Sequence, residues 1–544
     1  MRGSEVPATP HASLMARLDR LGPAAKEVAQ LSAAIGRDFG HELLAAVARQ
    51  PETELQATIG RLVDAGLVFQ RGVPPHATYL FKHVLVRDAS YASLLKSRRQ
   101  QLHASIARIL EDRFPEVATA EPERLAHHYT QAALAEPAVN YWRRAGELAI
   151  SRSAIFEAVA HFGHGLEVLA TLPDDRKRQH TEIELRLALA GALTATKGYT
   201  ALAVLREYER AREVAQQRND QGSLIRAMFG IWGYHSMQDN QSLAGQAARK
   251  LLKAAETHHD VAGRFIGHYC IGQGSFQAGA LSTATEHFQK ALALDDLEQA
   301  RIVCHSTAGL DIGANILNYF SRTLAVLGLP HQARSRRDEL LVRGRALGHA
   351  PSHATSCVGA FITSVLIRDT AGQASAVEKL LCFVAEERFP YYLALSEIYS
   401  GWLKIEDGHS ELGYFYLSLL ANGHLRSGRI DDGLDTLDRA ESLIRKSGSR
   451  WCEAEVHRLR GDLLLARSTK PEAETTYLKA LEIARSQDAK LWEIRAATSL
   501  GRLWHDQGKR QEARDLLAPV YGWFMEGFDT PDLMDAKALL EELQ

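Results

Sequence analysis

The sequence predicts a mainly α-helical protein, in which helical hairpins repeat along most of the chain and stack into a superhelix behind a small domain of helices and strands. Two observations support this fold class. Stretches near the C-terminus align when the chain is shifted by 40 residues, and residues 1–115 do not follow that spacing. Because 544 residues are too many for one hydrophobic core, either several domains or an array of repeats is expected, and the 40-residue period selects the array.

Small and large apolar residues occupy fixed positions in each repeat. Ala421 aligns with Gly461 and Gly501, and the same template fits an earlier block of the chain. Glycine or alanine is expected where two helix backbones touch, with a large apolar side chain filling the space beside them. The residues predicted to pack at these crossings are Gly146, Ala158, Phe162, Gly272, Ala284, Phe288, Ala291, Gly461, Ala473, Tyr477, Ala480, Gly501 and Ala513.

One copy matches a known repeat at nearly every signature position. Its residues are Trp142, Ala145, Gly146, Ala158, Phe162 and Gly165. This spacing resembles the tetratricopeptide repeat, a helix–turn–helix unit that usually recurs every 34 residues. The period here is 40 residues, and the six residues beyond the usual 34 are expected to lengthen the helices or the turns. Stacking tolerates this variation because each unit of such an array touches only the next unit.

The first 115 residues resemble a winged-helix domain. Helical periodicity covers Leu14–Ile35 with a break at Gly22-Pro23, and further helices are expected at His41–Ala48 and Glu52–Ala65. Strand-like runs then flank a turn at 72–75, and a long helix is expected from about Val84 to Asp112. Three helices followed by a β-hairpin form the winged-helix pattern.

The predicted domains are residues 1–115, 116–408 and 409–544. The second and third domains are two blocks of tetratricopeptide-like repeats. Around Trp402 there is room for only one helix before the next repeat, so a half-repeat with a local kink is expected there. The last helix, Leu533–Leu543, is expected to cap the open end of the array.

Composition favours a cytoplasmic protein. The formal charge is −2, from 64 basic and 66 acidic residues, so no global field attracts nucleic acid or an anionic membrane. No apolar run approaches the length of a membrane span, and the N-terminus does not read as a signal segment. The five cysteines show no paired spacing, which fits a reducing compartment and predicts neither a disulfide framework nor a zinc site.

Two short motifs widen the resemblance. Tyr79-Leu80-Phe81-Lys82-His83 is followed by Arg87-Asp88-Ala89-Ser90-Tyr91. With the repeats, they resemble the C-terminal half of bacterial signal-transduction ATPases of the STAND type, in which an adenylate or guanylate cyclase domain and an AAA-type ATPase module come first. The resemblance implies that the repeats sense a partner and relay its presence to a nucleotide switch.

The catalytic motifs of that family are missing from this sequence. A Walker A loop ends in Gly-Lys-Ser/Thr, whereas Gly508-Lys509 is followed by Arg510 within a predicted repeat turn. We therefore expect no enzymatic activity, no cofactor and no catalytic or metal-binding residue. His127-His128 has no third ligand at a suitable spacing, so these histidines are expected to lie at the surface or between helices.

The N-terminal domain offers two further candidate sites. The resemblance implies that His83 could touch a nucleotide bound to an ATPase module, although capping of the strand-to-helix junction is the commoner role. Lys96, Arg98, Arg99 and His103 could contact phosphates. The helix that would read DNA carries Glu52, Glu54 and Asp64 against Arg61 alone, however, which argues against nucleic-acid binding.

The leading hypothesis is a non-enzymatic interaction module of a bacterial signalling system. Its superhelical groove would hold a protein or peptide, contacted by Tyr234, Tyr269, Tyr416 and Arg460 from the first helix of each pair. One alternative is a fragment or partner chain of a separate ATPase or cyclase module. Another is a winged-helix transcriptional regulator.

Overall fold

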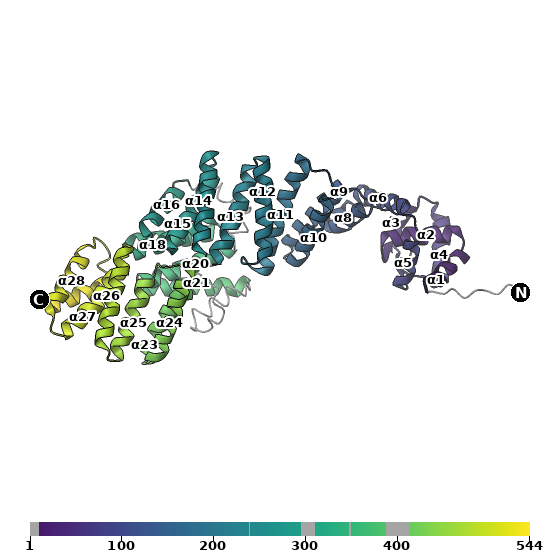
Figure 1. Ribbon diagram of the computed structural model, residues 1–544. Helices are drawn as coiled ribbons and strands as arrows, with labels where there is room; N and C mark the ends of the chain where they lie inside the picture. The colour runs from purple at the N-terminus through teal and green to yellow at the C-terminus, as the bar shows by residue number, and fades with distance from the viewer. Residues whose placement is uncertain (1–9, 239, 295–310, 347–349, 388–412) are drawn as a thin grey trace. The chain divides into compact units, whose positions relative to one another are not determined.

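The computed structural model describes residues 10–238, 240–294, 311–346, 350–387 and 413–544. The chain forms two compact units, Met1–Thr196 and Lys197–Gln544 (Figure 1). Each unit is built around its own hydrophobic core.

The N-terminal unit begins with helices and short strands in the order that the sequence predicts, with one strand added. Helix α3 has the predicted bounds, and the break between α1 and α2 falls at Gly22, before Pro23. The elements are α1 (Pro10–Arg20), α2 (Pro23–Ile35), β1 (Asp38–Gly40), α3 (His41–Ala48), α4 (Glu52–Asp64), β2 (Val68–Arg71) and β3 (Thr78–Phe81).

The three strands form an antiparallel sheet in the order β1-β3-β2. The predicted hairpin is β2 and β3, whereas β1 was not predicted because it has only three residues. Phe39 of β1 pairs with Tyr79 of β3, and their rings stack at 5.5 Å in the core. The opposite face of the sheet leaves Phe69 and Leu80 exposed.

The single long helix expected from Val84 to Asp112 is wrong. The structure has two helices, α5 (Val84–Ala92) and α6 (Lys96–Arg113). The hydroxyl of Ser93 donates to the carbonyl of Ser90, and Leu95 adopts an extended backbone at φ −63° and ψ 147°. Serine competes for backbone acceptors in this way, and no glycine or proline marks the break in the sequence.

The rest of the N-terminal unit is helical. Its hydrophobic core is continuous across residue 115, because Leu102 and Ile106 of α6 join Leu125 and Tyr129 of the following helices in one cluster. The remaining helices are α7 (Pro115–Ala120), α8 (Pro122–Gln131), α9 (Ala135–Ser151), α10 (Ile155–Leu169) and α11 (Arg176–Lys197).

The C-terminal unit consists of helical hairpins of the tetratricopeptide type. Its described helices are α12 (Leu202–Arg218), α13 (Gln221–Met237), α14 (Gln241–Thr257), α15 (Val261–Gln277), α16 (Leu281–Leu292), α18 (Ile312–Val326), α19 (Pro330–Ala346), α20 (Ala350–Leu366), α21 (Thr370–Glu387), α23 (Gly413–Arg426), α24 (Ile430–Ser447), α25 (Glu453–Ala466), α26 (Lys470–Ser486), α27 (Lys490–Asp506), α28 (Arg510–Gly522) and α29 (Pro531–Glu542).

At the predicted crossings, glycine meets an aromatic ring of the second helix. A Cβ atom added to Gly272 would lie 2.6 Å from the Phe288 ring, and one added to Gly461 would lie 2.5 Å from the Tyr477 ring. At Gly501 the nearest atom is instead on Leu539 of α29. The predicted alanine positions are fully buried: Ala158, Ala284, Ala291, Ala473, Ala480 and Ala513.

Alanine substitution at Gly146 is expected to destabilise the N-terminal unit by about 1–3 kcal/mol, because the new methyl group would lie 2.3 Å from the Phe162 ring. The matched control is Gly163 on α10, where an added Cβ would meet nothing within 4 Å. Gly163→Ala should stabilise by roughly 0.5–1 kcal/mol, as alanine normally does within a helix. Urea denaturation of both variants measures these changes. If both substitutions changed the free energy of unfolding in the same direction, the close contact between Gly146 and Phe162 would be contradicted.

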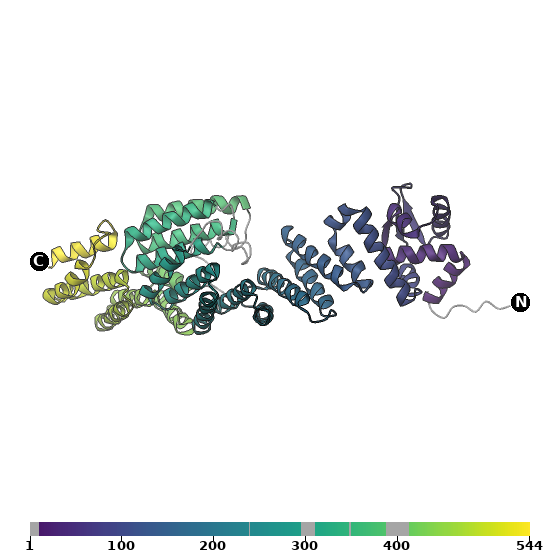
Figure 2. The same cartoon turned by 90° about the horizontal axis from the view of Figure 1, so that it is seen from above.

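Hairpins far apart in the sequence also touch, so the expectation that each hairpin packs only on its neighbours is wrong for the C-terminal unit. Trp451, between α24 and α25, stacks on Phe276 of α15 at 5.0 Å and contacts Phe415 of α23 at 5.2 Å. The Arg450 amide donates to the Gln277 carbonyl at 2.6 Å. Figure 2 shows the C-terminal helices beside the green hairpins that precede them.

The predicted half-repeat around Trp402 and the domain limit at 408 lie outside the described residues. The predicted capping helix corresponds to α29, whose Leu533 and Leu539 are buried against the preceding hairpin.

Candidate functional site

A pocket of about 700 Å³ opens inside the C-terminal unit. Helices α23, α25 and α27, which are the first helices of three successive hairpins, provide most of its lining. The end of α20, the start of α21 and the start of α29 provide the rest. The pocket therefore lies where the last hairpins meet an earlier one.

The 40-residue period of the sequence determines which side chains enter the pocket. In each of the three hairpins, the same four positions of the first helix line it, one helical turn or less apart. They form four columns: Phe415, Glu455 and Arg495; Ser418, Arg458 and Thr498; Leu419, Leu459 and Ser499; Asn422, Asp462 and Arg502. The pocket is thus one face of the repeat, presented three times.

The two ends of the pocket differ in chemistry. Near α20 and α23 the lining is apolar and includes Phe361, Val365, Tyr416 and Leu419. Toward α25, α27 and α29 it carries four carboxylates together with Arg458, Arg495 and Arg502, while Arg368 and Arg426 come from the α20–α21 turn and α23. A ligand in this space would therefore meet apolar surface at one end and ionic groups at the other.

Two carboxylates hold Arg458 at the floor of the pocket. Its guanidinium donates to both oxygens of Glu455, at 2.7 and 2.9 Å, and also to Asp462. The phenol of Tyr477 donates to the other oxygen of Asp462 at 2.7 Å. Burial and the Asp462 carboxylate raise the pKa of Tyr477, so the phenol stays protonated and remains a donor.

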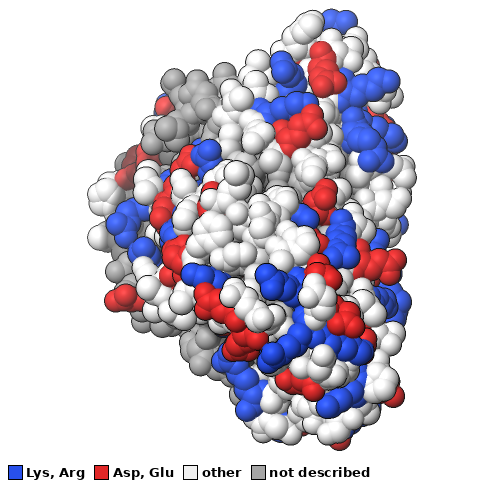
Figure 3. Space-filling view, turned by 90° about the vertical axis from the view of Figure 1, so that its left-hand side faces the viewer, with Lys and Arg blue, Asp and Glu red and all other residues white. Residues whose placement is uncertain are grey.

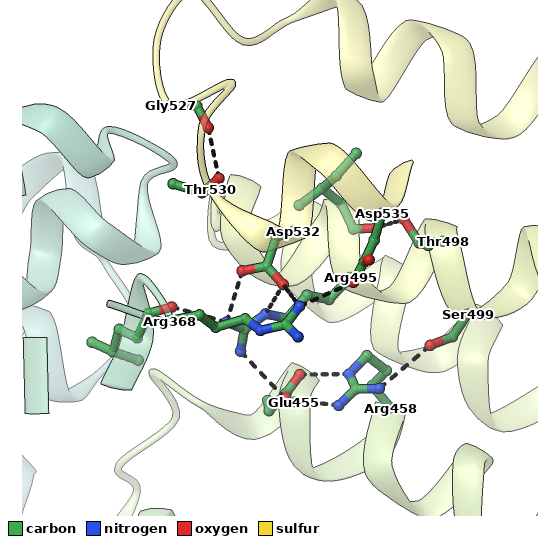
Figure 4. A network of polar contacts seen from close by, with 12 residues as sticks. Arg368, Glu455, Arg458, Arg495, Thr498, Ser499, Gly527, Thr530, Asp532 and Asp535 are labelled. Atoms are coloured by element: carbon green, nitrogen blue, oxygen red, sulfur yellow. Dashed lines mark hydrogen bonds and ion pairs between the residues drawn. The ribbon is translucent and has the colours of Figure 1, made fainter. Parts of the chain in front are cut away.

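A second ionic cluster joins α27 to α29 (Figure 4). Arg495 forms a two-bond pair with Asp532, at 3.0 and 2.9 Å, and donates to the Leu366 carbonyl at 2.8 Å. Arg368 contacts Asp532 at 3.3 Å and Asp535 at 3.0 Å. Burial alone would raise the pKa of Asp532, but Arg495 and Arg368 outweigh it and hold that pKa below its usual range.

Two pocket arginines remain available. Arg426 and Arg502 are exposed, and neither has a hydrogen bond or ion pair within the ranges that the structure describes. Each of the four pocket carboxylates, by contrast, already contacts an arginine. Figure 3 shows acidic and basic side chains interspersed over the face at the C-terminal end, so the free cations are a local feature.

The predicted groove residues fall in different places. Tyr416 lines the pocket, but Tyr234 and Tyr269 are buried, and the Tyr269 ring packs against Trp232 at 5.5 Å. Arg460 faces α24, where it pairs with Asp438 at 2.6 Å and Glu441 at 2.8 Å. Aromatic character was therefore a poor guide, since the hairpins use most of these rings for their own packing.

The candidate residues of the N-terminal unit are largely engaged. Arg98 pairs with Glu27 at 3.6 Å, Arg99 lies over the Tyr91 ring, and His103 is buried. The basic cluster therefore offers few free cations for phosphates. His83 is exposed at the N-cap position of α5, and its side chain makes no capping hydrogen bond.

His127 and His128 have a histidine neighbour that the sequence did not suggest. His103 of α6 lies beside them, with its Nδ1 atom 2.8 Å from Nδ1 of His128. Burial, followed by the charges of His127 and Arg99, lowers the pKa of His103 to about 4, so the pair is neutral at pH 7. Among the described residues, no three histidine, cysteine or acidic side chains are placed to hold a metal ion.

Within the described ranges, every helix is too short or too polar to cross a bilayer.

Comparison with known proteins found relatives but no family assignment, because no protein-family model matches the chain. An uncharacterized protein of Rhizobium meliloti is 26% identical over 522 residues, which cover 90% of this chain and 50% of the relative. The chain thus spans about half the length of the curated relative that it matches.

Several solved structures are similar to the chain at low sequence identity. A Signal Transduction ATPase with Numerous Domains, with a tetratricopeptide repeat sensor, from Pyrococcus horikoshii has 11% identity and a TM-score of 0.34, covering 90% of this chain and 68% of its own. A Rap protein complexed with competence and sporulation factor has 11% identity and a TM-score of 0.38. The match covers 75% of this chain and 98% of the Rap protein chain. A chain of the APC/C hetero-tetramer Cut9-Hcn1 has 12% identity and a TM-score of 0.40. The match covers 82% of this chain and 93% of that chain.

Proposed function

We propose that this chain is a protein-interaction module of a cytoplasmic signalling system, and that the pocket of its C-terminal unit binds an extended peptide segment. The observation that carries the proposal is the set of four columns, in which three successive hairpins present the same face to one concavity. Its volume of about 700 Å³ is within the range of ligand-binding pockets.

The chemistry of the lining indicates what such a peptide carries. Apolar side chains fit against Leu419 and its neighbours on α20 and α23. Because Arg426 and Arg502 have no described carboxylate partner, an acidic group on the peptide would complete their ion pairs. Asn422 supplies an amide, which can both donate to and accept from a peptide backbone.

Selection from a random dodecapeptide library on the full chain tests this function. Enriched peptides should bind the wild type, and Leu419→Asp should weaken them at least about tenfold, because a buried leucine contact is worth roughly 1.5–3 kcal/mol. Leu478→Asp on α26, exposed and outside the pocket, is the control and should change nothing. Failure to enrich peptides, or equal binding to Leu419→Asp, would refute the proposal.

Charge reversal in the same selection tests the acidic component. Arg502→Glu should deplete acidic peptides and enrich basic ones, whereas Arg514→Glu, on the exposed side of α28, should leave the composition unchanged. Calorimetric titration of the enriched peptides measures the affinities.

A second candidate function comes from the sequence resemblance to STAND-type signalling proteins. In it, this chain acts as part of, or partner to, a STAND-type ATPase or nucleotide cyclase, which agrees with its covering 50% of the longer Rhizobium meliloti relative. In that role a winged-helix domain at residues 1–115 would relay occupancy, with exposed His83 near the nucleotide. Calorimetric titration of the chain with ATP tests it, and measurable affinity would support this second role.

A further inference from the structure

The C-terminal segment reaches back to hairpins that lie far earlier in the chain. The amide of His331 donates to Glu526 at 2.9 Å, and its ring lies 2.9 Å from Asp529. Gly527 packs against Pro330, and Arg368 pairs with Asp532 and Asp535. Residues 524–535, which we call the clasp, therefore close the last hairpins onto α18–α21.

The clasp also forms part of the pocket wall. Pro531, Asp532 and Asp535 line the pocket beside Arg368 of the α20–α21 turn, which contacts both aspartates. The contact between the clasp and this turn is therefore a seam in the wall. Separation along the seam would widen the pocket without unfolding any hairpin.

Arg368 adopts a left-handed backbone conformation, which glycine usually occupies at the equivalent positions of this unit. In six hairpins of this unit, the second residue after the first helix has a positive φ, and it is glycine at 279, 328, 428 and 508 and serine at 468. Arg368 adopts φ 55° at the equivalent position, where a side chain costs roughly 1 kcal/mol. Its contacts with Asp532 and Asp535 give a reason for tolerating this cost.

The outer part of the seam, between Arg368 and Asp535, is weaker than the apolar packing of α29. Arg368 and Asp535 are 42% and 47% exposed, and exposed ion pairs contribute about 0–1 kcal/mol. Helix α29, in contrast, buries Leu533 and Leu539 against α27 and α28. Opening should therefore occur between the clasp and α18–α21, while α29 stays with the last hairpins.

We propose that this seam is the entrance to the pocket, which opens to admit a peptide and closes over it. The identity of the occupant rests on the proposed function, but the opening itself does not. Ser418 is a suitable reporter, because it lines the pocket and is buried in the closed form.

The test measures how fast a maleimide labels Ser418→Cys, read by mass spectrometry of the peptide that contains it, without any ligand. Arg368→Gln should raise the labelling rate roughly fivefold, the effect of losing a contact worth up to about 1 kcal/mol. Arg336→Gln is the matched control, since Arg336 is a half-exposed arginine paired with Glu339 away from the pocket. High salt should act like Arg368→Gln because it screens exposed pairs.

If Ser418→Cys were labelled at the same rate with and without the additional substitution Arg368→Gln, the proposal that the seam is the entrance to the pocket would be wrong. A similar rise in the labelling rate of buried Cys270 would also contradict the proposal, because it would show that Arg368→Gln unfolds the whole unit. Asp535→Asn provides a second variant that weakens the same seam from the other side. Because labelling needs no peptide, its outcome is independent of the library selection. If selected peptides bind in the pocket, they should slow the labelling.

Discussion

Trp451→Ala is expected to lower the free energy of unfolding of the C-terminal unit by about 3–5 kcal/mol, the usual cost of removing a large buried aromatic side chain. Trp451 is fully buried among Phe276, Phe415 and Trp492, and its carbonyl accepts a hydrogen bond from the Trp492 indole at 2.8 Å. The substitution leaves a cavity at the junction between the earlier hairpins and the last ones.

Urea denaturation followed by circular dichroism measures this effect. The control is Trp523→Ala, because Trp523 is about half exposed at the end of α28 and should cost less than about 1 kcal/mol. If both substitutions gave similar shifts, the contact between distant hairpins would not contribute to stability.

Asp532→Ala is expected to cost roughly 3 kcal/mol, because it leaves the buried guanidinium of Arg495 without its two-bond partner. Glu455 lies 3.5 Å from Arg495 and limits the loss. Asp535→Ala, one turn further along α29, removes a half-exposed carboxylate and should cost less than about 1 kcal/mol. Thermal unfolding of the two variants compares them directly.

The effect of Asp532 should also depend on pH in a defined direction. Arg495 and Arg368 hold the pKa of the Asp532 carboxyl below its unfolded value of about 3.9. The contribution of Asp532 to the free energy of unfolding is therefore complete above that pH. The contribution is lost as the pH falls through the lower pKa of the folded state. The difference between wild type and Asp532→Ala should therefore shrink in acid, and a constant difference would contradict the pairing.

The sequence predicted the hairpins well because their determinants are local. Gly461 must be small to admit the Tyr477 ring, and Gly508 ends a helix at a turn with φ 80°. The break between α5 and α6 was missed because no glycine or proline marks it, and the Ser93 hydroxyl bonds the Ser90 carbonyl there instead. Strand β1 was missed because pairing with β3, and not its own three residues, defines it.

The candidate site was predicted only in part, for a different reason. The period that located the packing positions also fixes the four columns of the pocket, so applying it to the neighbouring helix face would have found Asn422, Asp462 and Arg502. The contribution of Arg368 and Asp532 could not be found this way, since it depends on rotations accumulated over many hairpins. Contacts of this kind appear only in three dimensions.

The closure of the clasp on Pro330 and His331 has a consequence for how this unit can evolve. Open solenoids lengthen or shorten by whole modules, because the new ends need only a cap. Here the duplication or loss of one 40-residue module between α19 and α28 would carry the clasp past its docking place. The module count of this unit is therefore fixed by geometry, and variation should appear as substitutions within modules.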